Sequence, residues 1–371
     1  MALNETALVL PTFASRILAR HRAGDRSQVA MLFVAALVAG AVFSLLFSVT
    51  TGASDASAFE VIRDLATAKG TQGALSMRDH IIIFDIRLPR AILGFMIGAS
   101  LAVSGAIMQG LFRNPLADPG LVGVSSGAGF GAVVMIVLGG TLAAPLYAVL
   151  GIYALPIAAF SGGLATTLAL YRIATRNGQT SVATMLLAGI ALGALSTAMT
   201  GLLVYMADDK QLRDLTFWSM GSLAGATWMK IAAAGPIILL SFAAIPFMAR
   251  GLNAITLGEA AAFHMGVPVQ RLKTIAILSV AAGTGASVAV SGGIGFVGIV
   301  VPHILRMAIG PDHRYLLPAS ALLGGSLLIF ADVLARTVVV PAELPIGIIT
   351  AAVGGPFFLW ILLRHRTRLS L

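Results

Sequence analysis

Long hydrophobic runs separated by short polar stretches dominate the chain. A helix rises about 1.5 Å per residue, so about 20 apolar residues cross the roughly 30 Å hydrocarbon core of a bilayer. Seven runs reach this length, at residues 29–49, 91–112, 121–140, 146–171, 181–206, 228–248 and 345–363. We predict that each of them forms a transmembrane helix.

Three more spans come from the C-terminal half. The hydrophobic stretch 273–309 is too long for one crossing, and Gly292 and Gly293 interrupt it midway, so we predict two short spans there. A further run at 316–339 completes ten. The predicted fold is therefore all-α, a polytopic membrane protein of about ten transmembrane helices with both termini on one side.

One short sequence occurs twice. Residues 98–107 read GASLAVSGAI and residues 285–294 read GASVAVSGGI, which are identical at eight of ten positions. The copies fall in predicted spans two and seven, so the two halves have opposite orientations in the membrane. Inverted internal repeats are typical of transporters, whose halves rock about a central site. The alternative is that two helix faces rich in small residues converged because both pack closely.

Composition agrees with a chain that lipid surrounds. Hydrophobic residues make up 58% and charged residues 11%, with a mean hydropathy of +0.95, whereas soluble domains are roughly 45–50% apolar. The net charge of +9 would suggest a nucleic-acid partner in a soluble protein. Here the basic residues cluster at the ends of apolar runs, as the positive-inside rule predicts. Membrane lipid is therefore the expected partner, and nucleic acid is not.

Basic residues at both ends set the predicted orientation. Four arginines precede the first run and three follow the last one: Arg16, Arg20, Arg22, Arg26, Arg364, Arg366 and Arg368. Both termini are therefore expected in the cytoplasm. The first run exceeds the about 7–15 apolar residues of a signal peptide, so it is interpreted as a retained helix. The predicted regions are a cytoplasmic extension at 1–28, a transmembrane domain at 29–365 and a cytoplasmic tail at 366–371.

No motif for nucleotide hydrolysis occurs. The Walker A sequence requires a lysine directly after a glycine, and none of the four lysines follows one: Lys69, Lys210, Lys230 and Lys273. Cysteine is absent, which excludes thiolate metal sites and cysteine nucleophiles, and the six histidines form no metal-site pattern. We predict no catalytic residue, no cofactor and no metal, so the chain is not an enzyme.

Several motifs follow one another in a distinctive order. RLPR at 87–90 precedes the first repeat copy, and RNPLADPG follows it at 113–120. Later come GGIGFVG at 292–298, PHILR at 302–306, DHR at 312–314, ADVLAR at 331–336 and ELPIG at 343–347. In this order, over about residues 30–365, they resemble the permease subunits of ABC importers for iron chelates, haem and vitamin B12. The overall sequence is most similar to those of Gram-negative haem permeases.

The resemblance implies an importer in the bacterial inner membrane. It would contain two copies of this chain, two cytoplasmic ATPase subunits that hydrolyse ATP, and a periplasmic substrate-binding protein. Haem is the leading ligand, with a ferric siderophore or cobalamin as the alternative. An ion-coupled secondary transporter also uses inverted repeats, but acidic groups would be expected near the middle of its spans, and the predicted spans hold almost none. A membrane receptor or scaffold would not need a large cytoplasmic loop.

The polar segment 250–273 is the predicted coupling site for the ATPase, since the family carries two short docking helices at this position. The candidate residues are Leu257, Gly258, Glu259, Ala261, Met265 and Gly266. Leu257, Ala261 and Met265 recur at four-residue spacing and predict one apolar helix face, which Gly266 and Pro268 end. The general docking motif of ABC permeases is EAA followed by three residues and a glycine. Here four residues separate the EAA of 259–261 from Gly266. An interfacial helix lying on lipid is the alternative.

Three arginines fall on the outer side in the predicted topology, where the positive-inside rule disfavours them: Arg87, Arg90 and Arg336. In the resembling family, arginines at these motifs meet glutamates on the two lobes of the binding protein. The resemblance therefore implies that these three dock the binding protein. Local pairing of Asp85 with Arg87 or of Asp332 with Arg336 is the alternative, as is snorkelling to the interface.

The resemblance also implies that the translocation path follows the interface of a homodimer and is lined by span five, about 181–206. The candidate lining residues are Gly189, Gly193, Ser196, Thr197 and Met199. Such a wall offers little to hold a ligand, which suits passage.

Three further polar residues receive structural interpretations. His303 follows Pro302 inside a short span, and we expect it to satisfy a carbonyl that the proline frees. Asn114 and Asp118 precede Pro115 and Pro119, which is typical of a turn capped by side-chain hydrogen bonds.

Overall fold

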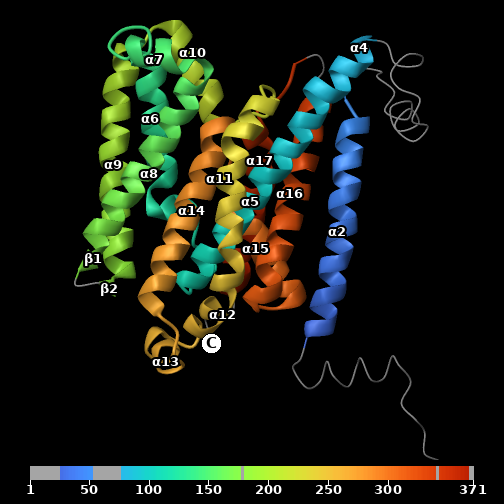
Figure 1. Cartoon of the computed structure of the whole chain (residues 1–371), viewed down its shortest axis with the longest axis vertical. Coiled ribbons are helices and arrows are strands. Elements are labelled where there is room, and N and C mark those ends of the chain that lie inside the picture. Colours follow the sequence, from blue (N-terminus) through green and yellow to red (C-terminus); the bar gives the residue numbers. More distant parts are fainter. Residues whose placement is uncertain (1–25, 53–76, 177–178, 340–341, 367–371) are drawn as a thin grey trace, which may run out of the picture.

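The protein is described by a computed structural model that covers residues 26–52, 77–176, 179–339 and 342–366. Helices make up nearly all of it and pack into one bundle (Figure 1). The only strands in the described ranges are β1 (Thr175–Arg176) and β2 (Gln179–Thr180), which pair antiparallel. Most of the predicted extension 1–28 and of the tail 366–371 lies outside the described residues.

The helices of the N-terminal half are α2 (Ser27–Thr50), α4 (Met77–His80), the π-helix η1 (Ile81–Arg87), α5 (Leu88–Leu111), the 3-10 helix η2 (Pro119–Val122), α6 (Val124–Leu138), α7 (Ala144–Leu150), η3 (Gly151–Tyr153) and α8 (Ala154–Ala174). Those of the C-terminal half are α9 (Val182–Met206), α10 (Asp209–Ser219), α11 (Trp228–Ala243), α12 (Ile245–Ile255), α13 (Glu259–His264), α14 (Val269–Ser291), α15 (Val297–Ile309), α16 (His313–Thr337) and α17 (Ile346–Arg366).

Ten apolar segments coincide with the ten predicted spans. Within the described residues, six helical stretches are long and apolar enough to cross a membrane, and α11 with α12 forms a seventh, bent span. Three shorter apolar helices, α6, α15 and the first part of α17, occupy the remaining predicted positions. The prediction of an all-α, polytopic fold of about ten membrane helices is confirmed.

The sixth span is not the single straight helix that we predicted at 228–248. α11 and α12 meet at a bend of 49°, and α12 continues to Ile255. Pro246 lies in the first turn of α12, where its ring cannot follow a helical turn without clashing with a preceding carbonyl. The bend directs α12 toward α13, with which it packs (Figure 1).

The two repeat copies lie in α5 and α14, which pack side by side at the centre of the bundle (Figure 1). α5 begins at η1 and runs toward α12, whereas α14 begins next to α13 and runs the opposite way, so the copies are inverted. They differ where they end. α5 continues through Gly105, which packs against the backbone of Gly298. α14 stops at Ser291 because Gly292 takes a φ of +73°, which glycine adopts without steric cost.

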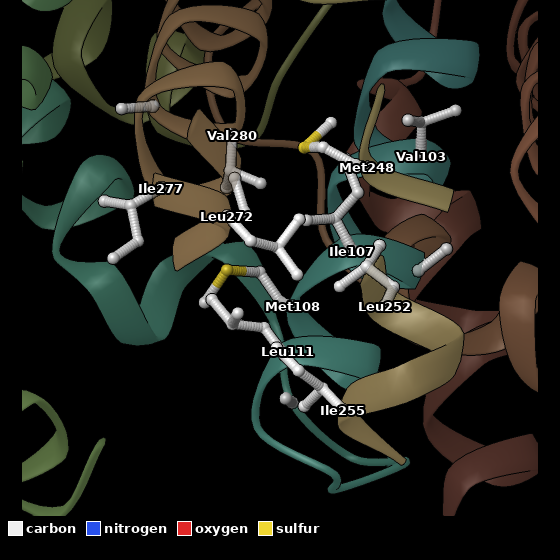
Figure 2. Close-up of a cluster of buried hydrophobic side chains, with 14 of the residues drawn as sticks. Val103, Ile107, Met108, Leu111, Met248, Leu252, Ile255, Leu272, Ile277 and Val280 are labelled. Atoms are coloured by element: carbon white, nitrogen blue, oxygen red, sulfur yellow. The ribbon is translucent and has the colours of Figure 1, made fainter. Parts of the chain in front are cut away.

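The bundle has two opposite ends. The α13 end holds α12, α13 and the start of α2, and the other end, called the arginine end, holds α4, the start of α5 and the end of α16 (Figure 1). Arg87, Arg90 and Arg336 belong to these segments or directly adjoin them. Near the α13 end, a buried apolar cluster joins three helices (Figure 2): Val103, Ile107, Met108 and Leu111 of α5, Met248, Leu252 and Ile255 of α12, and Leu272, Ile277 and Val280 of α14. Ala262 of α13 belongs to the same cluster, so close packing fixes α13 to the bundle.

Candidate functional site: the α13 segment, the arginine network and α9

The α13 segment presents apolar side chains to its surroundings. Leu257, Phe263 and Met265 are 70%, 69% and 54% exposed, whereas Ala262 is buried in the core. Gly258, with a φ of +110°, precedes the helix, and Gly266, with a φ of +81°, follows it. Three large exposed apolar groups on one short segment are unusual unless a partner or lipid covers them.

The helix is shorter than the four-residue spacing predicted. α13 covers only Glu259 to His264, so Leu257 and Met265 flank it, and the predicted single face with Ala261 does not form as one helical stripe. Phe263 is also exposed. The sequence did not predict this, because Phe263 does not lie at the four-residue spacing of Leu257, Ala261 and Met265. The two flanking glycines end the helix early, since their positive φ values break the helical repeat.

A buried lysine anchors the α13 segment. The ammonium nitrogen of Lys273 lies 2.7 Å from a carboxylate oxygen of Glu259 and donates a hydrogen bond of 2.8 Å to the carbonyl oxygen of Thr180. Thr180 also donates its backbone N–H to the side chain of Gln270 at 3.0 Å. Lys273 is 2% exposed, so its charge depends on these partners. The segment is thereby tied to β2, which leads directly into α9.

A second polar cluster surrounds the DHR motif at the α13 end. Asn253 donates to a carboxylate oxygen of Asp312 at 2.7 Å and accepts the backbone N–H of His313 at 2.8 Å. The guanidinium of Arg314 lies 2.6 Å from the same carboxylate. Burial alone would raise the pKa of Asp312, but the hydrogen bonds from Arg314 and Asn253 outweigh it and lower the pKa to about 2. The motif therefore caps α16 and joins it to α12.

At the arginine end, Asp332 forms ion pairs with two arginines. Its carboxylate lies 2.8 Å from a guanidinium nitrogen of Arg90 and 3.4 Å from one of Arg336. Arg90 also reaches Glu343 at 2.9 Å, and Arg336 donates to the carbonyl oxygen of Ser48 at 2.9 Å. The pairing of Asp332 with Arg336, which is the local alternative to docking of a binding protein, is present.

Arg87 completes this network. Its guanidinium donates to the backbone carbonyl oxygens of Val49 and Thr50 at 3.0 and 3.3 Å. The three arginines are only 3–6% exposed, so each guanidinium faces into the chain, and they join α2, α5 and α16. Their predicted role in docking a binding protein stays a prediction.

α9 lies at the edge of the bundle opposite α2 (Figure 1). Within α9, all of which is described, only Met185 is buried. Thr197 and Met199 are exposed, and a side-chain carbon added at Gly193 would meet no atom within 4 Å. Gly189 and Ser196 are partly buried. The predicted path residues thus lie on a helix whose outer face is open, and their role in translocation stays a prediction.

The capped turn after α5 has the predicted hydrogen bonds. Asn114 accepts the backbone N–H of Leu116 at 3.0 Å, and Asp118 accepts that of Gly120 at 2.7 Å.

The ring of His303, in α15, lies edge-on to Phe357, with 6.1 Å between ring centroids. Its expected contact with a freed carbonyl stays a prediction.

A helical bundle with an inverted repeat, no nucleotide motif and a projecting apolar segment at one end defines the class, a membrane-embedded permease subunit of a transporter. Residues 29–364 match the FecCD transport family, and the chain belongs to that family. It is thus a multi-pass permease of the ABC transporter class in the bacterial inner membrane.

Individual relatives cover most of the chain. It is 49% identical over 289 residues to the Hemin transport system permease protein HmuU of Yersinia pestis, across 78% of this chain and 85% of the relative. It is 44% identical over 304 residues to the Cobalamin import system permease protein BtuC of Halobacterium salinarum, across 82% and 79%. A solved metal-chelate type ABC transporter in an inward-facing conformation has a TM-score of 0.76 and 31% identity, across 89% of this chain and 98% of that one.

Proposed function

We propose that this chain is the permease of an ATP-driven importer that moves haem across the inner membrane into the cytoplasm. The observation that carries the ligand is the 49% identity to a hemin permease, compared with 44% and 41% to two cobalamin permeases. The importer contains two copies of this chain, two cytoplasmic ATPase subunits and a periplasmic binding protein. ATP hydrolysis belongs to the ATPase, because this chain has no Walker A motif.

The α13 segment is the proposed contact with the ATPase. The exposed Leu257, Phe263 and Met265 support this role, because a few well-buried apolar anchors supply most of the binding free energy of an interface. On this proposal the segment faces the cytoplasm. The start of α2 lies at the same end of the bundle (Figure 1), which supports a cytoplasmic N-terminus, and ten spans would return the C-terminus to the same side.

The exposed face of α9 is the proposed wall of the translocation path. Two copies of the chain would bring their α9 helices together around a passage lined by small residues and by Thr197 and Met199. Cysteines introduced at these two positions should react with a polar thiol reagent in at least one nucleotide state of the assembled importer. Failure to react in every state would remove α9 from the path.

The arginine network is the proposed guide for the binding protein. The network holds three arginines, Arg87, Arg90 and Arg336, but only two carboxylates, so its excess positive charge would attract an acidic partner. Reversing the partner's acidic residues to lysine leaves this chain unchanged, and it should slow association most strongly at low salt. Unchanged association at low salt would leave the arginines with a structural role alone.

The alternative within the same machinery is a different chelate. The identity of 44% to a cobalamin permease over 304 residues supports cobalamin, and the likeness to a metal-chelate transporter supports a ferric siderophore. An ion-coupled transporter of the same ligand is a further alternative, and it would work without the ATPase.

Proteoliposomes containing this chain, its ATPase and its ligand-loaded binding protein separate these readings. We expect uptake of hemin that requires ATP, and no uptake of cyanocobalamin or ferric hydroxamate. Uptake of cobalamin without hemin would replace the ligand but keep the machinery. Hemin uptake driven by an ion gradient without the ATPase would overturn the machinery itself.

A further inference from the structure

A cavity of about 290 Å³ lies between the two repeats, and its largely apolar lining includes Asp118 and three hydroxyl side chains. It is lined by Leu101 of α5, Ser125 of α6, Ser219 of α10, Thr284 of α14 and, from the loop after α5, Asp118. Leu101 and Thr284 lie ten and seven residues before the ends of their helices, which is roughly 10–15 Å along the helix axis. The cavity is therefore deep in the membrane-spanning region.

Both interruptions of the repeats meet at this cavity. Asp118 belongs to the irregular segment between α5 and α6, and residues 293–296, between α14 and α15, also line the cavity. Breaks in membrane helices are where many transporters bind small ions, because the non-helical backbone presents carbonyl groups there.

Asp118 forms no ion pair with the part of the chain that the structure describes. Among the described residues, no basic side chain lines the cavity. Its one hydrogen bond comes from the backbone N–H of Gly120, at 2.7 Å. Burying a carboxylate at this depth costs free energy unless a positive group compensates its charge.

Three hydroxyl side chains line the cavity together with Asp118. Thr284 is 2% exposed, and its hydroxyl has no hydrogen-bond partner among the described residues. Ser125 lies close to Asp118, since a side-chain carbon added at Gly120 would be 2.9 Å from the carboxylate and 3.7 Å from the Ser125 hydroxyl. The hydroxyl of Ser219 donates to a backbone carbonyl, so its lone pairs remain able to bind.

We propose that this cavity binds a small monovalent cation such as Na⁺, held by the carboxylate of Asp118 and the hydroxyl groups of Ser125, Ser219 and Thr284. Carboxylate, hydroxyl and carbonyl oxygens are the ligands of hard cations. A monovalent ion neutralises the single carboxylate, whereas a divalent ion would leave an excess positive charge at this depth. The ion joins the two interruptions and does not drive transport, so the proposal is independent of the haem ligand.

Thermal unfolding of the full-length chain in lipid nanodiscs tests the site. NaCl is titrated against choline chloride at constant ionic strength, with unfolding followed by tryptophan fluorescence. We expect the midpoint temperature to rise with Na⁺ and to saturate, because a ligand that binds only the folded state stabilises it. Asp118→Asn should abolish the rise, and the control Asp209→Asn, on the exposed start of α10, should keep it.

Thr284→Val keeps the side-chain shape and removes one oxygen ligand, so it serves if Asp118→Asn fails to fold. It should raise the Na⁺ concentration for half-saturation by about tenfold, because one oxygen ligand of the ion is lost. Identical unfolding of the wild type in NaCl and in choline chloride would overturn the proposal. An equal Na⁺ response in Asp118→Asn, or a response to pH without one to Na⁺, would overturn it as well, the latter by showing a proton in the place of the ion.

Discussion

Three buried arginines at one end of the bundle contrast with the exposed apolar side chains of the α13 segment at the other end. At the arginine end, Arg87, Arg90 and Arg336 are buried, and they are paired or hydrogen-bonded within the chain. At the α13 end, Leu257 and Phe263 are exposed. The three arginines find partners within the chain, whereas Leu257 and Phe263 leave apolar area that a partner can cover. The buried charges at the α13 end, foremost Lys273, hold that apolar segment in place.

The strongest test of this contrast removes the centre of the arginine network. Asp332→Asn leaves Arg90 and Arg336 buried without their shared carboxylate. Loss of one partner from a buried ion pair costs about 3–5 kcal/mol, so the free energy of unfolding should fall by about that amount. Unfolding in mixed detergent micelles measures it, with the exposed Asp209→Asn as the matched control. An unchanged unfolding free energy would mean that the network does not stabilise this end.

A substitution at the α13 end should change binding and leave stability alone. Phe263→Ser removes an exposed anchor, and anchors of this type contribute about 2 kcal/mol or more to an interface. The affinity for the ATPase should therefore fall by roughly 30-fold, as measured by titration of the labelled ATPase onto the chain in nanodiscs. Leu142→Ser, at a residue that is 83% exposed in the turn before α7, is the control. Equal affinities in both variants would place the ATPase elsewhere.

Lys273 links the two roles of the α13 end, anchoring and coupling. Lys273→Met fills the same space without charge, and it disconnects Glu259 from Thr180 at the entry to α9. We expect this link to transmit about 0.5–2 kcal/mol of coupling free energy between the ATPase contact and α9. The variant should therefore transport roughly 2- to 30-fold less ligand per ATP. ATPase binding should persist. The neighbouring exposed Arg271→Met should transport normally, and a normal transport ratio in Lys273→Met would exclude this link.

Acid should weaken the α13 end by a smaller amount. The pKa of Asp312 is lowered to about 2 in the folded chain, below the usual value of about 3.9. The stabilisation is therefore fully present above pH 4 and is lost as the pH falls toward 2. Because Asp312 is partly exposed, the effect is modest. Asp312→Asn should remove this part of the acid dependence of unfolding, and an identical acid dependence in the variant would contradict the assignment.

Hydropathy and glycine positions predicted the fold well, because a span requires a long apolar run that few soluble sequences contain. The ten segments follow from these runs, and the repeat follows from the near-identity of residues 98–107 with 285–294. The bend at Ala244 was missed, since the apolar run continues through Pro246 without a break in composition. Helix length at α13 was also misjudged, because it depends on two glycines with positive φ.

The side-chain pairings could be predicted only in part. Spacing alone suggested Asp332 with Arg336, which are four residues apart, but not Arg90 with Asp332, which meet across the bundle. Asp118 was read as a turn cap, and it does cap Gly120. Its place beside a cavity depends on how the two repeats pack, which no local pattern records.

ATP-driven uptake of hemin by the complete importer in proteoliposomes tests the central claim most directly. The account predicts hemin accumulation that requires ATP, the ATPase and the binding protein, and that falls when Phe263→Ser or Lys273→Met is present. Vesicles that accumulate cobalamin or a ferric siderophore, but no hemin, would contradict the proposed ligand. Hemin uptake that is equally fast without the ATPase would contradict the account as a whole.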